Sequence, residues 1–297
     1  MNHLYSGILK YYLDTNAVRA LAPRLDECKE IGAFISLWTI CEMIGHMIKR
    51  PEDFRKIREN FRAIKDSRIS IVTKMPDELH YGAFSLELLV PIGSTSLDLR
   101  KMALLTLEAE TYDEWMKKIS EYSLLGTYKF VKEIDSATSR LNQNIEKQYD
   151  TNISTHESQK KYEEFVLTED KATTHQRLLE YYVDGFIEKH EDVRMMGVML
   201  KMSYEEFKQF LCNAYDGSID LAFRVNACVV DKKVSLRQKF KRNDDTDMMH
   251  LYYIQNDIIL VTDDRALREN VVAQYPERAM SVERFKYILK NNQRTPE

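Results

Sequence analysis

Short apolar runs alternate with amphipathic stretches along the first part of this chain. The apolar runs are brief and rich in β-branched or aromatic residues, which favours strands, and the stretches between them carry apolar side chains at helical spacing. The predicted strands are Lys10 to Leu13, Ala33 to Leu37 and Arg68 to Val72, and the predicted helices run from Asn16 onward, from Thr39 to Lys49 and from Pro51 to Asp66. Strands that alternate with helices in this way predict a parallel sheet flanked by helices.

The same alternation returns at the end of the chain. Ile258 to Val261 is a wholly apolar strand, as expected for a parallel sheet that is buried on both faces. A short edge strand is predicted at Arg278 to Ser281, and helices are predicted at Ile219 to Val230, Asp244 to Gln255, Arg265 to Val272 and Val282 to Leu289. Two distant regions with one pattern predict a single discontinuous α/β domain.

The middle of the chain has a different, mainly helical pattern. Long stretches rich in Leu, Glu, Lys and Met contain few Gly or Pro residues, and a polar segment from Asp150 to Ser158 interrupts them as a loop. We therefore predict a discontinuous α/β domain at residues 1–75 and 216–297, and a mostly α-helical insertion at residues 76–215.

Composition predicts a globular cytoplasmic protein. The 297 residues, of which 44% are hydrophobic, supply a sizeable core. We expect no membrane span, because no apolar run approaches the required length of about 18 residues, and no signal peptide, because the start of the chain has neither a basic nor an apolar region. The 4 cysteines lie far apart and indicate neither a disulfide framework nor a structural zinc site.

Acidic residues follow the predicted strands or lie on helices next to them. Asp14 follows the first strand and Asp263 and Asp264 follow the strand at Ile258, while Glu42 and Asp247 lie on neighbouring helices. The carboxyl ends of parallel strands meet at one edge of a sheet, so we expect these residues to converge. Clustered carboxylates repel one another unless a cation is present, and oxygen ligands select Mg²⁺ or Mn²⁺ over zinc. Metal-dependent phosphodiester hydrolysis is the chemistry that fits.

Each of these acids also has a purely structural explanation. Asp14 and Asp263 can serve only as helix N-caps, Glu42 can be a solvated residue on a helix face, and the acids around Asp247 can simply favour the start of a helix. The occurrence of all four segments together, in this order, favours the metal site.

Four segments of the chain resemble the motifs of PIN-domain nucleases, the fold of VapC-type ribonucleases. They are Tyr11 to Asn16, Ser36 to Glu42, Asp247 to Leu251 and Ile259 to Leu267. The resemblance implies an α/β fold with a PIN-like parallel sheet, here interrupted by the helical insertion, which compact members of the family lack. The implied reaction is endonucleolytic cleavage of RNA, less often of DNA, by a water molecule that a metal ion activates.

The resemblance also implies roles for individual residues. Asp14, Glu42, Asp247 and Asp264 would be catalytic and would bind Mg²⁺ or Mn²⁺, and Asp263 is a lesser candidate for the same metal site. Asn16 and Thr262 would orient the carboxylates from behind. His250 is interpreted as a packed or orienting residue rather than a general base.

A basic segment precedes Asp247 in the sequence. It runs from Lys232 to Arg242 and contains no acidic residue. Because a carboxylate pocket repels phosphate, a nuclease needs cationic groups nearby, and we predict that Arg237, Lys239, Lys241 and Arg242 bind nucleic acid. Since the net charge of the chain is −4, this binding would depend on the local patch; a solvated loop is the simpler alternative.

Three functional hypotheses follow. The first is a metal-dependent endoribonuclease, with a bacterial stress response or phage defence as its context. The second is a catalytically inactive PIN-like scaffold that binds a protein partner through the helical insertion, which could equally form a homodimer interface. The third is a nuclease that uses the same site on DNA.

Overall fold

The computed structural model describes residues 10–86, 94–134, 179–180, 182–188, 190–236, 238–239 and 244–292. The chain divides into two compact units. The first comprises Met1–Pro76, Ile92–Ile134 and Met249–Glu297, and the second comprises Asp77–Pro91 and Asp135–Met248. Each unit is described below by itself.

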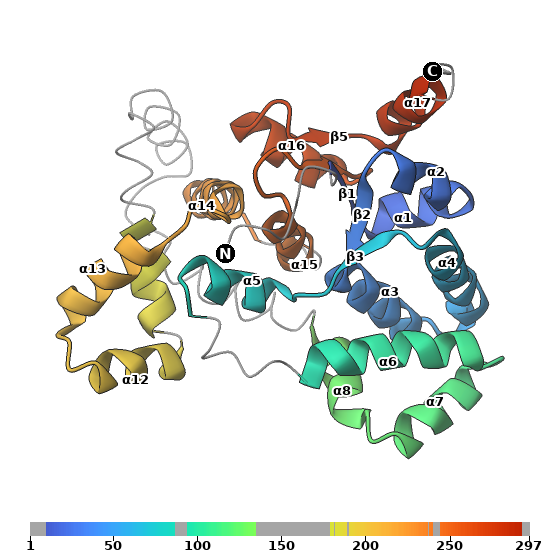
Figure 1. Cartoon of the computed structure of the whole chain (residues 1–297), viewed down its shortest axis with the longest axis horizontal. Helices are drawn as coiled ribbons and strands as arrows, with labels where there is room; N and C mark the ends of the chain where they lie inside the picture. Colours follow the sequence, from blue (N-terminus) through green and yellow to red (C-terminus); the bar gives the residue numbers. More distant parts are fainter. Residues whose placement is uncertain are drawn as a thin grey trace. The chain divides into compact units, whose positions relative to one another are not determined.

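The first unit contains a parallel five-stranded sheet, which confirms the predicted α/β class. The strand order is β3-β2-β1-β4-β5. The strands are β1 (Tyr11–Leu13), β2 (Ala33–Ser36), β3 (Ser70–Val72), β4 (Ile259–Val261) and β5 (Ala279–Met280), and Figure 1 shows how they lie. In the register, Leu13 pairs with Val261, so strands from the two ends of the sequence are direct neighbours.

Helices connect the parallel strands, as the sequence pattern predicted. Between β1 and β2 lie α1 (Thr15–Leu21), the 3-10 helix η1 (Ala22–Arg24) and α2 (Leu25–Glu30). Between β2 and β3 lie α3 (Leu37–Lys49), the 3-10 helix η2 (Pro51–Asp53) and α4 (Phe54–Ser67). The helix α16 (Arg265–Gln274) connects β4 to β5, and α17 (Val282–Asn292) follows β5.

The central strands are apolar on both faces because helices cover the sheet. Tyr12 and Leu13 of β1, Phe34 and Ile35 of β2, and Leu260 of β4 are all completely buried. Such runs, without polar alternation, are typical of parallel sheets. The sheet therefore forms the rigid core from which the strand ends project.

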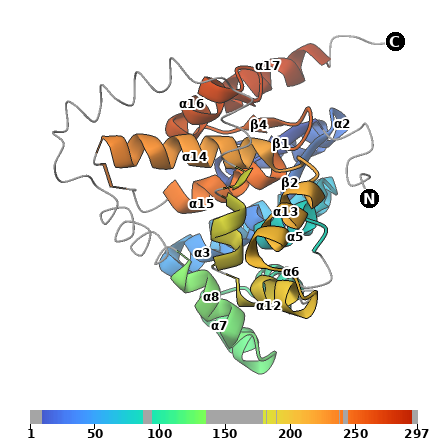
Figure 2. The same ribbon diagram turned by 90° about the vertical axis from the view of Figure 1, so that its left-hand side faces the viewer.

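Three helices from the predicted insertion pack within the first unit. They are α6 (Ser94–Glu108), α7 (Tyr112–Glu121) and α8 (Leu125–Glu133), and α7 and α8 lie side by side in both Figure 1 and Figure 2. Trp115 of α7 is completely buried and donates its indole N–H to the carbonyl of Met102 on α6 at 3.2 Å. The helices α6 and α8 both contact α3. The compact units thus divide the chain at other points than the predicted domain boundaries at residues 75 and 216.

The second unit is helical in the part that the structure describes. Its helices are α5 (Pro76–Ala83), α12 (Glu191–Met199), α13 (Tyr204–Ala214), α14 (Asp220–Ser235) and α15 (Asp244–Met249), of which α5 and α15 each share a terminal residue with the first unit. Aromatic rings pack around His80: Phe186 stacks on it with centroids 4.2 Å apart, and Tyr182 approaches to 5.1 Å. This cluster is the core of the unit.

One predicted segment lies outside the described residues, and one predicted helix is divided in the structure. The polar loop at Asp150 to Ser158 lies outside the described residues. The predicted helix at Asp244 to Gln255 is two elements, because α15 ends at Met249 and a 3-10 helix, η3 (His250–Tyr253), continues it. Among the described residues, no helix is both long enough and apolar enough to cross a membrane.

Candidate functional site

The order of the strands in the sheet reverses between β1 and β4. From β1 the chain proceeds to β2 on one side, and from β4 it proceeds to β5 on the other side. In open parallel sheets, ligands bind at the point where the strand order reverses, outside the carboxyl ends of the two central strands. Asp14 directly follows β1, and Thr262 directly follows β4. The two polar residues therefore stand at the expected place for a ligand site.

Asp14 is buried and held from two sides. Its side chain is the N-cap of α1, with Oδ1 accepting a hydrogen bond from the amide of Ala17 at 2.7 Å. Its Oδ2 accepts one from the hydroxyl of Thr262 at 2.5 Å. Burial raises the pKa of Asp14, while His250, Thr262 and the Ala17 amide act in the opposite direction and Glu42 adds to the rise. A nearby cation would stabilise the ionised form of this carboxyl group.

Thr262 links the two acidic strand ends. The hydroxyl that donates to Asp14 also accepts a hydrogen bond from the amide of Asp264 at 2.9 Å. The carboxylate of Asp264 caps α16, with Oδ1 accepting from the amide of Leu267 at 2.7 Å. Asp14 and Asp264 are thus joined through one completely buried threonine. Thr262 therefore contacts the Asp14 carboxylate and the Asp264 backbone, and its role in orienting metal ligands stays a prediction.

Asp263 points to another element. It is exposed, and its Oδ1 accepts a hydrogen bond from the amide of Val282, the first residue of α17, at 3.1 Å. A carboxylate at the start of a helix stabilises the unsatisfied N–H groups there. Asp263 therefore has a structural role at α17, and its place among the candidate metal ligands stays a prediction.

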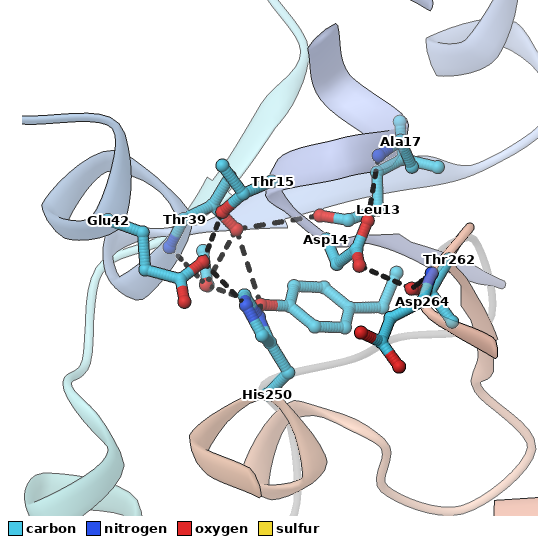
Figure 3. A network of polar contacts seen from close by, with 11 residues as sticks. Leu13, Asp14, Thr15, Ala17, Thr39, Glu42, His250, Thr262 and Asp264 are labelled. Carbon is cyan, nitrogen blue, oxygen red and sulfur yellow. Dashed lines mark hydrogen bonds and ion pairs between the residues drawn. The ribbon is translucent and has the colours of Figure 1, made fainter. Parts of the chain in front are cut away.

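Glu42 is held by two hydrogen bonds. It lies on α3, away from the apolar face of that helix, and its Oε2 accepts hydrogen bonds from the hydroxyl of Thr15 and from Nε2 of His250, the latter at 2.7 Å. Figure 3 shows that the other carboxylate oxygen points away from this network. Glu42 thus has a fixed orientation and one oxygen available to a ligand.

Behind Glu42 lies a buried relay of hydrogen bonds. Nδ1 of His250 contacts the hydroxyl of Tyr12 at 2.5 Å, and that hydroxyl also contacts Ser36 at 2.8 Å. Burial raises the pKa of Tyr12, so its phenol keeps its proton and can donate it to Nδ1. In a neutral His250, Nε2–H then donates to Glu42, which satisfies both ring nitrogens. The relay positions the glutamate from the core of the sheet.

Sequence reasoning missed two members of this network. Thr15 holds Glu42, whereas its neighbour Asn16, which we expected to orient a carboxylate, is exposed on α1. Tyr12 reads as an ordinary apolar strand residue, and its contact with His250 joins positions 238 residues apart. A hydroxyl next to Asp14 was a visible signal for Thr15, but no local pattern identifies Tyr12.

The contacts described above involve none of the remaining predicted residues. Asp247 lies on α15, in the part of that helix assigned to the second compact unit. Lys239 is exposed and its carbonyl accepts a hydrogen bond from Nζ of Lys233 at 3.1 Å. Arg237, Lys241 and Arg242 lie outside the described residues. The metal-binding role of Asp247 and the nucleic-acid-binding role of the basic residues stay predictions.

The donor chemistry of the site suits a hard divalent cation. Asp14, Glu42 and Asp264 offer carboxylate oxygens, and the groups that hold them are hydroxyls, amides and one imidazole. Oxygen ligands of this kind favour Mg²⁺ or Mn²⁺. Within the described part of the chain, no three His, Cys, Asp or Glu side chains gather closely enough to hold a metal ion by themselves. The residues thus match such an ion by ligand type, and a bound metal stays a prediction.

Comparisons of the chain with protein families, with curated proteins and with solved structures gave no match.

Proposed function

We propose that this chain is a metal-dependent endoribonuclease with a PIN-like core, in which Asp14, Glu42 and Asp264 hold Mg²⁺ or Mn²⁺. One observation carries the proposal: Asp14 and Asp264 follow the two strands at which the sheet order reverses, and the buried hydroxyl of Thr262 bonds to both. Buried polar groups of this kind add little to stability compared with apolar packing, so their presence at the ligand-binding edge supports a chemical role.

Different residues of the chain have different roles in the proposed hydrolysis. A bound divalent cation supplies positive charge that neutralises the carboxylates and activates water for attack at phosphorus. Thr262 fixes the orientation of Asp14, while Thr15 and His250 fix that of Glu42. In the reaction, the water oxygen bonds to phosphorus and one bridging P–O bond breaks. One water proton ends on the departing oxygen and the other is released, which leaves a hydroxyl and a phosphate monoester.

The first prediction tests the site through Asp14→Asn. Asparagine still caps a helix, so α1 should form, but the negative charge is lost. We expect cleavage of single-stranded RNA with Mn²⁺ to fall by more than about 100-fold. Mutation of residues that only orient a metal ligand already lowers metal affinity or activity by about 10–100-fold. The measurement is the cleavage rate of a labelled RNA by wild type and variant, purified in parallel, with DNA of the same sequence as a second substrate.

A matched control comes from Asp257→Asn, which removes an exposed acid in the turn before β4, at the opposite end of that strand. Its cleavage rate should equal that of the wild type. Equal rates for Asp14→Asn and wild type would rule out this site. Cleavage of DNA but not RNA would keep the site and change the substrate.

A second candidate function, a non-catalytic scaffold for a protein partner, is favoured by apolar side chains on α12. Val198 is 63% exposed and Met199 is 78% exposed. Exposed apolar groups that lie together indicate an interaction surface. Thermal stabilisation by millimolar Mn²⁺ distinguishes the two functions, because a protein that binds no metal gains no stability from it.

A further inference from the structure

Arg19 lies on the same face of α1 as the threonine that holds Glu42. Residues four apart on a helix are neighbours on its surface, so Arg19 lies one turn beyond Thr15. The helix α1 contacts α3, which carries Glu42. Of the acidic groups that raise the pKa of Arg19, Glu42 has the largest effect, followed by Asp53 and Asp14. The guanidinium therefore belongs to the electrostatic surroundings of the candidate site.

Arg19 is half-buried, and its buried Nε atom has no hydrogen-bond partner among the residues that the structure describes. The neighbouring acids already have other partners: Oδ2 of Asp53 lies 2.7 Å from Nε2 of His46, and Oε2 of Glu42 accepts from Thr15 and His250. By contrast, Arg24, just past α1, pairs with Glu27 at 2.5 Å. Arg19 thus has donor capacity that the described contacts do not use.

An arginine with an unused N–H donor is suited to bind an oxyanion. Burial lowers the pKa of Arg19, and Glu42 opposes this effect, so the charged form is retained but poorly solvated. A buried donor without a partner lowers the stability of the fold. The guanidinium carries five N–H donors in a fixed fork that matches the oxygens of phosphate. A ligand with such oxygens would supply the missing partner.

We propose that Arg19 binds a non-bridging phosphate oxygen of the polynucleotide substrate beside Asp14 and Glu42. The inference rests on the proposed nuclease function and adds to it the group that holds the substrate. Carboxylates at the strand ends repel a phosphodiester, and a cation next to them offsets this repulsion. The basic segment before Asp247 is not needed for this contact, since Arg19 and both acids belong to the first compact unit.

The second prediction tests this inference by Arg19→Gln. Binding of a fluorescent single-stranded RNA is measured by anisotropy in the Asp14→Asn background, where the RNA stays intact, over a range of salt concentrations. We expect Kd to rise at least about tenfold, as for loss of a charge-assisted hydrogen bond. The slope of log K against log salt should decrease by about 0.7, the value for one phosphate contact on a single strand. With Asp14 present, KM should rise more than kcat falls.

Two further variants complete the experiment. Arg24→Gln removes a nearby arginine that is already paired with Glu27, and its RNA binding should equal that of the parent. Arg19→Lys restores the charge and should recover the salt slope while regaining only part of the affinity, because lysine lacks the fork.

The outcomes separate the inference from the proposed function. Unchanged RNA binding by Arg19→Gln would overturn the inference, and so would failure of this variant to fold, since Arg19 would then be only a structural counter-charge for Glu42. A salt slope that Arg19→Lys does not recover would also overturn it. Unchanged cleavage by Asp14→Asn would instead refute the nuclease function itself.

Discussion

The two compact units of this protein bury different kinds of side chain. At the strand ends of the first unit, buried polar groups form two hydrogen-bonded sets, which together we call the polar network: Tyr12 with Ser36, Thr39 and His250, and Asp14 with Thr262. In the second unit, the buried groups around His80 are mainly aromatic rings, comprising Tyr182, Phe186, Phe84 and Phe223. The strand ends of the first unit are organised by hydrogen bonds, and the surroundings of His80 by ring packing.

This difference indicates where function lies. Apolar rings stabilise a fold by their burial alone, and their positions are set by packing. Buried hydroxyls and carboxylates contribute little net stability, yet leaving any one of them without its partner is costly. A fold that needed only stability could fill the strand ends of the first unit with apolar residues. Their polar network is better explained by a need to orient Asp14 and Glu42.

The third prediction has the largest expected effect on stability. Phe186→Ala should destabilise the second unit by about 3–5 kcal/mol, because it removes a ring that is only 2% exposed and leaves a cavity next to His80. Hydrogen exchange measured peptide by peptide should increase in α5, α12 and α14. If ring packing and the polar network are separate features, exchange in β1 and β4 should stay close to the wild-type rate.

Phe210→Ala is the control within the same unit. Phe210 lies on α13 and is 38% exposed, so its truncation should cost less than about 1 kcal/mol. Equal losses for the two variants would mean that the cluster around His80 is not the core of the second unit. Faster exchange in β1 to the same extent as in α12 would mean that the two regions unfold together.

The sequence was sufficient to predict the sheet. The run Ile258 to Val261 is apolar without alternation, and the structure has a buried strand there, at Ile259–Val261. The β/α alternation at both ends of the chain predicted one parallel sheet built from both, although the direct pairing of β1 with β4 was not predicted. The predicted features are local patterns that burial imposes on each strand separately, and for that reason a single sequence reveals them.

The connections within the site were not predictable in the same way. The bond between Tyr12 and His250 depends on how a strand at one end of the chain packs against a 3-10 helix near the other end. Likewise, α6 to α8 were assigned to an insertion because their helical pattern differs from the β/α pattern, although Met102 and Trp115 pack within the sheet-containing unit. Periodicity identifies an element, but not the element against which it packs.

The fourth prediction concerns the polar network and has an intermediate effect. Thr262→Val keeps the shape of the side chain but removes the hydroxyl that bonds to Asp14 and to the amide of Asp264. We expect the free energy of unfolding to fall by about 1.5–3 kcal/mol, the range for a hydrogen bond to a charged group. Cleavage of RNA should also fall by about 10–100-fold, because Asp14 loses its fixed orientation. The measurements are urea unfolding and the cleavage rate.

Thr106→Val provides the matched control for Thr262→Val. Thr106 is also completely buried, but its hydroxyl only donates back to the carbonyl of Met102 within α6, at 2.9 Å. Loss of this hydroxyl should lower the free energy of unfolding by about 1 kcal/mol or less and leave the cleavage rate unchanged. Similar losses of activity in both variants would mean that Thr262 acts through general stability and not through Asp14.

The fifth prediction concerns His80 and has the smallest expected effect. Burial lowers the pKa of His80 from 6.5 to about 3, and His190 adds to this effect. The folded protein therefore keeps His80 neutral where the unfolded chain takes up a proton, so stability is fully present above pH 6.5 and declines as the pH falls toward 3. Between pH 7.5 and pH 5.5, the contribution of His80 should lower the free energy of unfolding by about 1.4 kcal/mol.

Urea unfolding of the wild type and of His80→Phe at these two pH values isolates this effect. Phenylalanine keeps a flat ring against Phe186 but cannot take up a proton, so the loss between pH 7.5 and pH 5.5 should be about 1.4 kcal/mol smaller in the variant. All other groups titrate alike in both proteins and cancel in the difference. Equal losses in the two proteins would mean that folded His80 takes up its proton as readily as the unfolded chain does. The second unit would then have a solvated histidine at its centre, and the contrast between an apolar ring cluster and a polar network would no longer hold.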